Sequence, residues 1–134
     1  MRPDITMLEL TIPGKPIAKK RPRFFRRGKF VGTYNEQQTE EGRWQLMAQS
    51  QIKETVPTGT PIALVCMFYM PIPKSTPKKN RTTDHIKKPD LDNLVKYVKD
   101  CLNGVLWHDD SQVCHLTATK RYSENPRTEI IVQW

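Results

Sequence analysis

The residues with the clearest capacity for chemistry are aspartates grouped between residues 90 and 110. Asp90 and Asp92 lie where a proline-rich segment gives way to an amphipathic stretch, and Asp109 and Asp110 follow that stretch. Clustered aspartates are the usual ligands of hard divalent cations, which polarise a phosphate and lower the pKa of an attacking water. If the fold brings the two pairs together, this spacing indicates metal-assisted hydrolysis of a phosphodiester.

A lysine accompanies the first aspartate pair. Lys96 falls one helical turn beyond Asp92 on the same polar face, where an ammonium group can stabilise developing negative charge or orient a nucleophile. A purely structural interpretation also stands: Asp90 and Asp92 cap a helix, and Asp92 pairs with Lys96 at the i,i+4 spacing. His108 is kept outside the candidate set, because solvated loop histidines are common.

Positive charge is concentrated in two segments of the 134-residue chain, which has 22 Lys and Arg, 14 Asp and Glu and a formal net charge of +8. Residues 15–29 hold eight bases and no acid, and residues 74–88 hold six bases and one acid. Blocks of like charge repel unless an opposite surface neutralises them, and nucleic-acid phosphate is such a surface. Solvated loops that serve only solubility are the alternative. The candidate nucleic-acid-binding residues are Lys19, Lys20, Arg21, Arg23, Arg26, Arg27, Lys78, Lys79, Arg81, Lys87 and Lys88.

Composition excludes several other classes of protein. Three cysteines without a CxxC pair fit neither a disulfide scaffold nor a common zinc site, so reduced structural thiols are expected. No apolar run is long enough to cross a bilayer, and no apolar N-terminal stretch of the signal-peptide type is present. We therefore expect a soluble, cytoplasmic protein with no membrane partner and a single domain over residues 1–134.

The elements that must position the aspartates follow from the apolar pattern. Strands are predicted at residues 5–12, 61–70, 112–122 and 128–134. The second is expected to be a central strand buried on both faces, and the last two are expected to form a hairpin. A helix capped by Asn35 is predicted to run to about residue 54, after a short ribbon at residues 29–34. The apolar spacing of residues 92–102 predicts the best-defined helix.

This order of elements, roughly β-α-β-α-β-β, predicts an α+β fold in which two main helices pack on a mixed β-sheet. Residues 71–89 lack periodicity and predict a long loop that carries the second basic segment. A helix of about eleven residues is about 16 Å long, so the chain after it must double back into a neighbouring strand. Only that reversal would return Asp109 and Asp110 to the first pair.

Residues 87–113, KKPDLDNLVKYVKDCLNGVLWHDDSQV, resemble the signature of the RusA family of Holliday junction resolvases. The resemblance extends over an ordered series of parts: the DLDN block, a lysine shortly after it, Leu-Asn-Gly, an aromatic residue and Asp-Asp-x-Gln-Val. The opening GKPIAKKRPRF, residues 14–24, is similar to the N-terminal segment of the branch found in phages, prophages and Gram-positive bacteria.

The resemblance implies a small α+β subunit that acts as a homodimer and cuts four-way DNA junctions with Mg²⁺ or Mn²⁺. It places the family's metal-binding acids on Asp90, Asp92 and Asp110 and its catalytic lysine on Lys96, with Asp109 as a less certain ligand. Lysines 87 and 88 stand where the family can have arginines, and lysine lacks the bidentate fork of arginine. A dimer suits a four-way junction, because two equivalent strands must be cut and each subunit carries one carboxylate cluster.

Two other functions fit the same residues. A non-catalytic DNA-binding protein would use the basic segments to bind, with affinity that falls steeply with salt and no metal-dependent product. A nuclease with another preference, for flaps, forks or RNA, would share the aspartates and differ only in its substrate.

Overall fold

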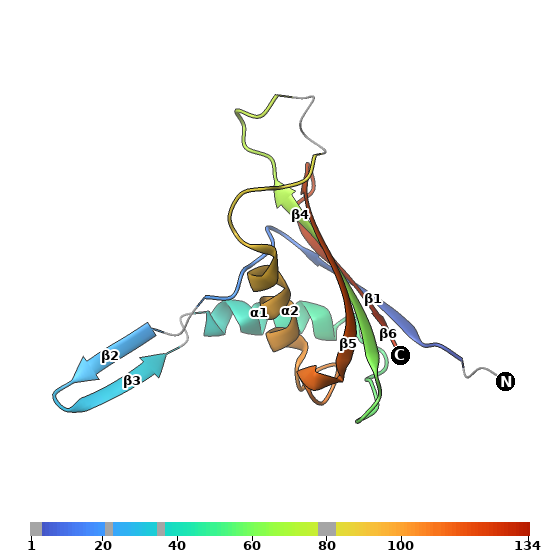
Figure 1. The fold of residues 1–134 in the computed structure, drawn as a ribbon, viewed down its shortest axis with the longest axis horizontal. Helices are drawn as coiled ribbons and strands as arrows, with labels where there is room; N and C mark the ends of the chain where they lie inside the picture. Colours follow the sequence, from blue (N-terminus) through green and yellow to red (C-terminus); the bar gives the residue numbers. More distant parts are fainter. Residues whose placement is uncertain (1–3, 21–22, 35–36, 78–82) are drawn as a thin grey trace.

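The fold is a four-stranded mixed sheet with both helices on one of its faces (Figure 1). The computed structural model describes residues 4–20, 23–34, 37–77 and 83–134. The sheet order is β1-β6-β4-β5, in which only β4 and β5 are parallel. The predicted α+β class is therefore confirmed. In chain order the elements are β1 (Met7–Pro13), β2 (Arg23–Arg27), β3 (Phe30–Tyr34), α1 (Gln38–Gln49), β4 (Ile62–Pro71), α2 (Leu91–Leu102), the 3₁₀ turn η2 (Asp110–Gln112), β5 (Val113–Ser123) and β6 (Arg127–Gln133).

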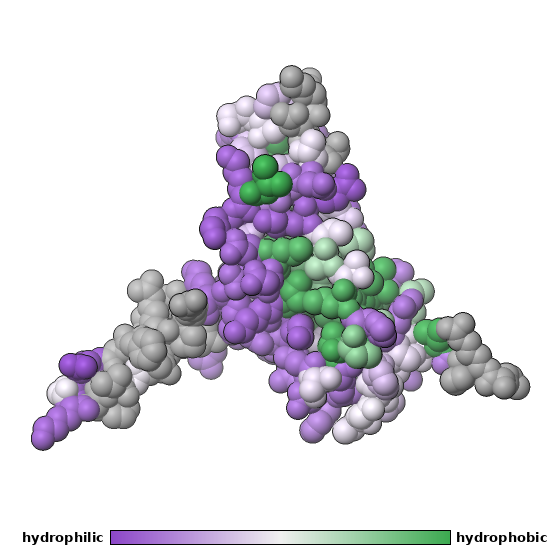
Figure 2. All heavy atoms as spheres, in the orientation of Figure 1, coloured by the Kyte–Doolittle hydropathy of each residue, from purple (hydrophilic) through white to green (hydrophobic). Residues whose placement is uncertain are grey.

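Strand β4 has a neighbour on each edge, as expected of a central strand, but it is buried on one face only. Alternate residues from Ile62 to Met70 are buried, and those between them are half-buried. The prediction of burial on both faces is wrong, because the two helices cover a single face of the sheet. Figure 2 shows hydrophobic residues gathered over the sheet, beside the hydrophilic helical side.

Strands β5 and β6 do not form the predicted hairpin, because β4 lies between them. Val65 of β4 is paired with Thr117 of β5 on one edge and with Ile131 of β6 on the other. The apolar β4 thus finds hydrogen-bond partners on both edges, which its buried backbone requires. The residues after β5 do reverse the chain, as their turn chemistry indicates, but the reversal crosses the end of β4.

Helix α2 is the parallel crossover between β4 and β5, a connection that two parallel strands need. Six of its twelve residues are buried, and they follow the predicted apolar spacing: Leu94, Val95, Tyr97, Val98, Cys101 and Leu102. The opposite, polar face of α2 is left open. The start of β5 therefore lies where residues just before it can return to α2.

Helix α1 is shorter than predicted, since it ends at Gln49, and the proposed cap Asn35 lies outside the described residues. Trp44 and Ala48 are its buried residues. The Trp44 ring meets the edge of the Tyr97 ring of α2 with 6.2 Å between centroids, which joins the two helices. Cys66 and Cys101 are free and buried, whereas Cys114 is free and exposed.

The first basic segment divides into two parts. Its early residues, 15–20, run past both helices, and its later residues form β2, which pairs with β3. The ribbon predicted at residues 29–34 thus holds only the second strand of this hairpin, whose first strand lies in the predicted basic loop. This hairpin projects away from the rest of the molecule (Figure 1). Among the helices of the described ranges, none has the length and hydropathy needed to cross a membrane.

Candidate active site

A cavity of about 510 Å³ lies along the open face of α2. Asp92, Lys96 and Asp100 recur at i+4 spacing, which stacks their side chains along one side of the helix. Asp110, from η2, lines the same cavity. The chain reversal after α2 therefore brings Asp110 to the cavity that Asp92 lines. The full lining is Asp92, Asn93, Val95, Lys96, Lys99, Asp100 and Asp110.

Asp110 is held by a buried tryptophan. The indole Nε1 of Trp107 donates a hydrogen bond to Asp110 Oδ1 at 2.8 Å, and Trp107 is 2% exposed. Partial burial raises the pKa of Asp110, while the hydrogen bond from Trp107 and the charge of Lys99 oppose that rise. The aromatic residue of the sequence motif thus both orients this carboxylate and favours its charged form.

Asp109, its neighbour, serves the local fold. Its Oδ1 accepts a hydrogen bond from Ser111 N at 3.0 Å, and its own N–H donates to Gln112 Oε1 at 3.0 Å, the reciprocal pattern of a capping box. The hydrogen bond from Ser111 lowers the pKa of Asp109. Asp109 is exposed and does not line the cavity, so the turn that it caps is what presents Asp110.

Asp90 occupies the N-cap position of α2 but makes no side-chain capping hydrogen bond. Its Oδ1 lies 3.0 Å from Nζ of Lys88, and the two side chains are 52% and 87% exposed. Within the described ranges no ion pair joins Asp92 to Lys96. Among the described residues, neither the capping hydrogen bond from Asp90 nor the Asp92–Lys96 ion pair of the structural interpretation is therefore formed.

The donor chemistry of the cavity fits a hard divalent cation, because Asp92, Asp110 and the amide of Asn93 offer oxygen ligands. Across the ranges that the structure describes, no three His, Cys, Asp or Glu side chains are grouped closely enough to hold an ion. Ligation by Asp90, Asp92, Asp110 or Asp109 thus stays a prediction.

Sequence reasoning missed Lys99 and Asp100, which line the cavity on α2. The helical period was a sufficient signal, because residues three and four beyond Lys96 share its face. Lys99 lies near enough to Asp110 for its charge to lower the pKa of that carboxyl. The cavity therefore holds two lysines rather than the one predicted.

The Lys19 side chain is largely buried and forms ion pairs next to the cavity. Its Nζ lies 2.7 Å from Glu41 Oε1 and 3.4 Å from Asp100 Oδ2, and its side chain is 17% exposed. Burial alone would lower the pKa of Lys19, but its hydrogen bond to Glu41 and the charges of Glu41 and Asp100 raise it. Its N–H also donates to Asn93 O at 3.0 Å. This lysine ties residues 15–20 to both helices.

The other predicted basic residues lie in different settings. Lys20, Arg26, Arg27, Lys87 and Lys88 are exposed. Arg23 begins β2. Arg21, Lys78, Lys79 and Arg81 lie outside the described residues.

Lys120 fixes the segment that leads to Asp90. Its Nζ donates to Lys87 O and to Pro89 O, each at 2.7 Å. The backbone of residues 83–85 also bonds to β5, through His85 N to Lys120 O and Tyr122 N to Thr83 O. No periodicity in residues 71–89 indicated this docking, because both acceptors are backbone carbonyls.

The chain is similar to known proteins over most of its length. The chain matches the family model described as endodeoxyribonuclease RusA over residues 13–133. It is also 35% identical over 141 aligned residues to "Uncharacterized protein YqaN" of Bacillus subtilis strain 168, covering 94% of this chain and 95% of that protein. Both aspartate pairs, both basic segments and all the cavity residues lie within the matched range.

Proposed function

Because the chain belongs to the RusA endodeoxyribonuclease family, we propose that it is a metal-dependent endonuclease that resolves four-way (Holliday) DNA junctions by paired symmetric cuts. The observation that carries this proposal is the cavity that Asp92, Lys96 and Asp110 share, although thirteen residues separate Lys96 from Asp110 in sequence. The cuts would serve DNA recombination and repair in the cytoplasm of a bacterial or phage-infected cell.

In this proposal Asp90, Asp92 and Asp110 hold Mg²⁺, or Mn²⁺ as a substitute, with Asp109 as a further candidate. Such an ion, when bound, polarises the scissile phosphate and lowers the pKa of the attacking water. Trp107 orients Asp110, and its hydrogen bond opposes the rise that burial causes in the pKa of that carboxyl. Lys96 and Lys99 place positive charge in the cavity, where negative charge develops on the phosphate.

The basic residues would offset the repulsion between the carboxylates and DNA. Neutralising phosphates with Lys and Arg releases counterions and supplies affinity that does not depend on sequence. We assign this role first to the exposed residues near the site and on the projecting hairpin. They are Lys20, Lys87, Lys88, Arg26 and Arg27.

We further propose a homodimer, since one cavity per subunit can cut one strand. The sheet face opposite the helices carries Val65, Met67 and Ile131, which are half-buried in the single subunit. These apolar side chains, beside the Arg127–Glu129 ion pair on the same face, suit contact with a second copy of the chain. Sedimentation equilibrium tests this: a dimer for the wild type and a monomer for Met67→Glu support it, and a monomeric wild type contradicts it.

The decisive experiment compares an end-labelled four-way junction with a linear duplex of the same sequence. Each is incubated with Mg²⁺ and with EDTA, using the wild type, Asp92→Asn and the matched control Asp4→Asn, whose carboxylate is exposed outside the cavity. We expect symmetric nicks confined to the junction, lost in EDTA and in Asp92→Asn but retained in Asp4→Asn.

Each other outcome supports a different function. Tight junction binding without cleavage in Mg²⁺ or Mn²⁺ indicates a non-catalytic DNA-binding protein. Equal or faster cleavage of flaps, forks or RNA indicates a nuclease with another substrate preference. Full cleavage by Asp92→Asn rejects the site assignment.

A further inference from the structure

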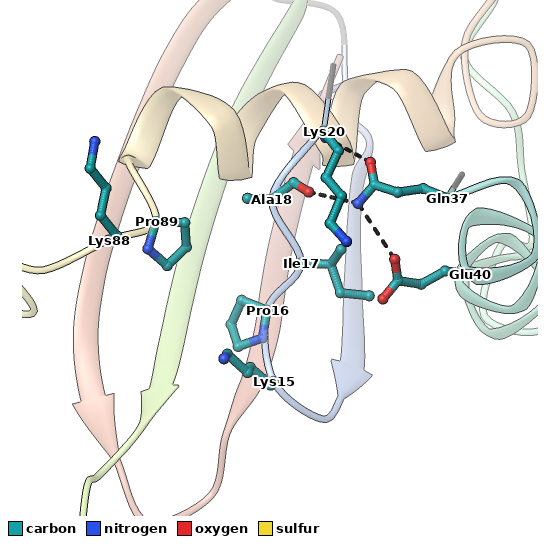
Figure 3. A pocket seen from close by; sticks show the side chains of 9 residues that line it. All are labelled: Lys15, Pro16, Ile17, Ala18, Lys20, Gln37, Glu40, Lys88 and Pro89. Atoms are coloured by element: carbon teal, nitrogen blue, oxygen red, sulfur yellow. Dashed lines mark hydrogen bonds between the residues drawn. The ribbon is translucent and has the colours of Figure 1, made fainter. Parts of the chain in front are cut away.

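A second hollow, of about 560 Å³, lies beside the segment that leads into α2. Its floor is apolar and includes Pro16, Ile17 and Pro89, and Lys15, Lys20 and Lys88 also line it (Figure 3). In Figure 3, Lys88 and Pro89 stand on one side and residues 15–20 on the other, with Lys20 directed toward Glu40. Lys15 and Lys88 are exposed and are not directed toward Glu40, and the Lys88 ammonium lies beside Asp90 at the start of α2.

The wall of this hollow is fixed by a buried amide. Gln37 is 1% exposed, and its Nε2 donates to Ala18 O at 2.8 Å and to Glu40 Oε2 at 3.4 Å (Figure 3). Its Oε1 accepts a hydrogen bond from Lys20 N at 2.7 Å. A wall that is already ordered costs a ligand little conformational entropy on binding.

An adjoining hollow of about 310 Å³ shares Lys15 and Lys88 with the first and adds Lys87, His85 and Tyr122. His85 is 9% exposed, and its Nδ1 has no hydrogen-bond partner among the residues that the structure describes. Burial and the charges of Lys120, Lys15 and Lys87 lower the pKa of this imidazole. A buried polar atom without a partner, among cations, is suited to a ligand that carries anionic oxygens.

The two hollows lead toward the candidate active site. Lys88, which lines both, lies 3.0 Å from Asp90 through Nζ and Oδ1. Asp90 immediately precedes α2, whose second residue Asp92 lines the catalytic cavity. A polyanion bound along the hollows therefore ends beside the carboxylates.

We propose that these hollows form one groove that binds a single unpaired DNA strand next to the branch point and directs it to the carboxylates. This inference rests on the proposed junction cleavage. It specifies which part of the junction binds in the groove. Lys15, Lys87 and Lys88 contact phosphates, and the apolar floor covers sugars and the faces of unstacked bases. A paired duplex presents mainly its phosphates and keeps its base faces stacked inside, so it leaves such a floor unused.

The test is binding in EDTA, where cleavage does not occur, read by fluorescence anisotropy. The probes are a dye-labelled single strand and a blunt duplex of the same sequence. The proteins are the wild type, the double variant Lys15→Gln with Lys88→Gln, and the control Lys53→Gln, an exposed lysine outside both hollows. Circular dichroism and thermal melting establish that each variant is folded.

We expect the double variant to bind the single strand about tenfold more weakly, with a slope of log K against log salt shallower by about 1.4 for two lost phosphate contacts. Duplex binding changes by less than about threefold, because a duplex that stays outside the groove keeps its contacts with the other basic residues. Lys53→Gln behaves as the wild type. The groove is rejected by any of three results: no binding of single strand by the wild type, an unchanged double variant, or an equal loss on duplex. Because cleavage plays no part in this assay, a wild type inactive on junctions would reject the proposed function without altering these results.

Discussion

The two aspartate pairs, one at the start of α2 and one after it, resemble each other more closely than the two members of each pair do. In both pairs one carboxylate lines the cavity, Asp92 or Asp110, and the other, Asp90 or Asp109, is exposed outside it. Aspartates one or two positions apart thus receive different settings. What separates them is the element that carries each side chain, not the spacing in sequence.

The second pair shows the physical basis of the division. Asp110 is partly buried against Trp107, and that burial raises its pKa. Asp109 is exposed and accepts a backbone hydrogen bond that lowers its pKa. One carboxylate is held where desolvation strengthens its interaction with a charged ligand, and the other stabilises the turn that presents it.

The largest difference between Asp110 and Asp109 should appear in the rate of junction cleavage. Asp110→Asn is expected to lower the junction cleavage rate about 1000-fold, equivalent to about 4 kcal/mol, because it removes a charged oxygen ligand from the cavity. The matched control Asp109→Asn removes the same charge one residue away and keeps a capping side chain, so its rate should stay within about threefold. Initial rates in saturating Mg²⁺ provide the measurement, and equal losses in the two variants would erase the distinction.

Trp107→Phe should have an intermediate effect, because it removes only the hydrogen bond that orients Asp110. A bond to a charged group contributes about 1.5 to 3 kcal/mol, so the rate should fall by about 10-fold to 150-fold. Trp44→Phe is the control, since it shortens another buried tryptophan that does not contact Asp110. Single-turnover rates measured well below both melting temperatures check this, and similar rates for both variants would mean that Asp110 is positioned without Trp107.

Asp109→Ala should affect stability instead. Loss of the hydrogen bond to Ser111 is expected to lower the free energy of unfolding by about 1 kcal/mol, the usual effect of deleting a cap. Urea denaturation monitored by circular dichroism measures this. Asp109→Asn should retain most of the stability, and an unchanged Asp109→Ala would show that Gln112 alone holds the turn.

The smallest effect is expected at the other exposed carboxylate. Lys88→Gln removes the ion pair with Asp90, but Lys88 is 87% exposed, so the free energy of unfolding should change by less than about 0.5 kcal/mol. The same denaturation assay checks this value. A larger loss would give Asp90 an anchoring role like that of Asp109.

The features best predicted from the sequence are those that depend on the residue pattern of a single helix or strand. The apolar residues from Leu94 to Leu102 determine which side of α2 packs, and so which side carries Asp92 and Lys96. The need for a reversal after α2 was also evident from helix length. By contrast, the partner of Asp110 is a tryptophan whose ring nitrogen is directed by tertiary packing, which no periodicity encodes.

The order of strands in the sheet is harder to predict from the sequence, because strands far apart in the chain compete for the same pairing edges. The turn residues after Ser123 favour a reversal, and a hairpin is the simplest product of a reversal. β4 is the most apolar strand and takes the position between β5 and β6. Similarly, the docking of residues 83–89 depends on Lys120 and two backbone carbonyls, which leave no mark in the sequence of the loop itself.

The position of β6 also determines when the protein can assemble during translation. Residues 127–133 form an interior strand, between β1 at the beginning of the chain and β4 in its middle (Figure 1). The sheet therefore cannot close while those residues are still inside the ribosome. Until they emerge, the edges of β1 and β4 that pair with β6 have no partner. The sheet on which α2 packs is then incomplete. Nuclease activity should consequently arise only after synthesis has passed this strand.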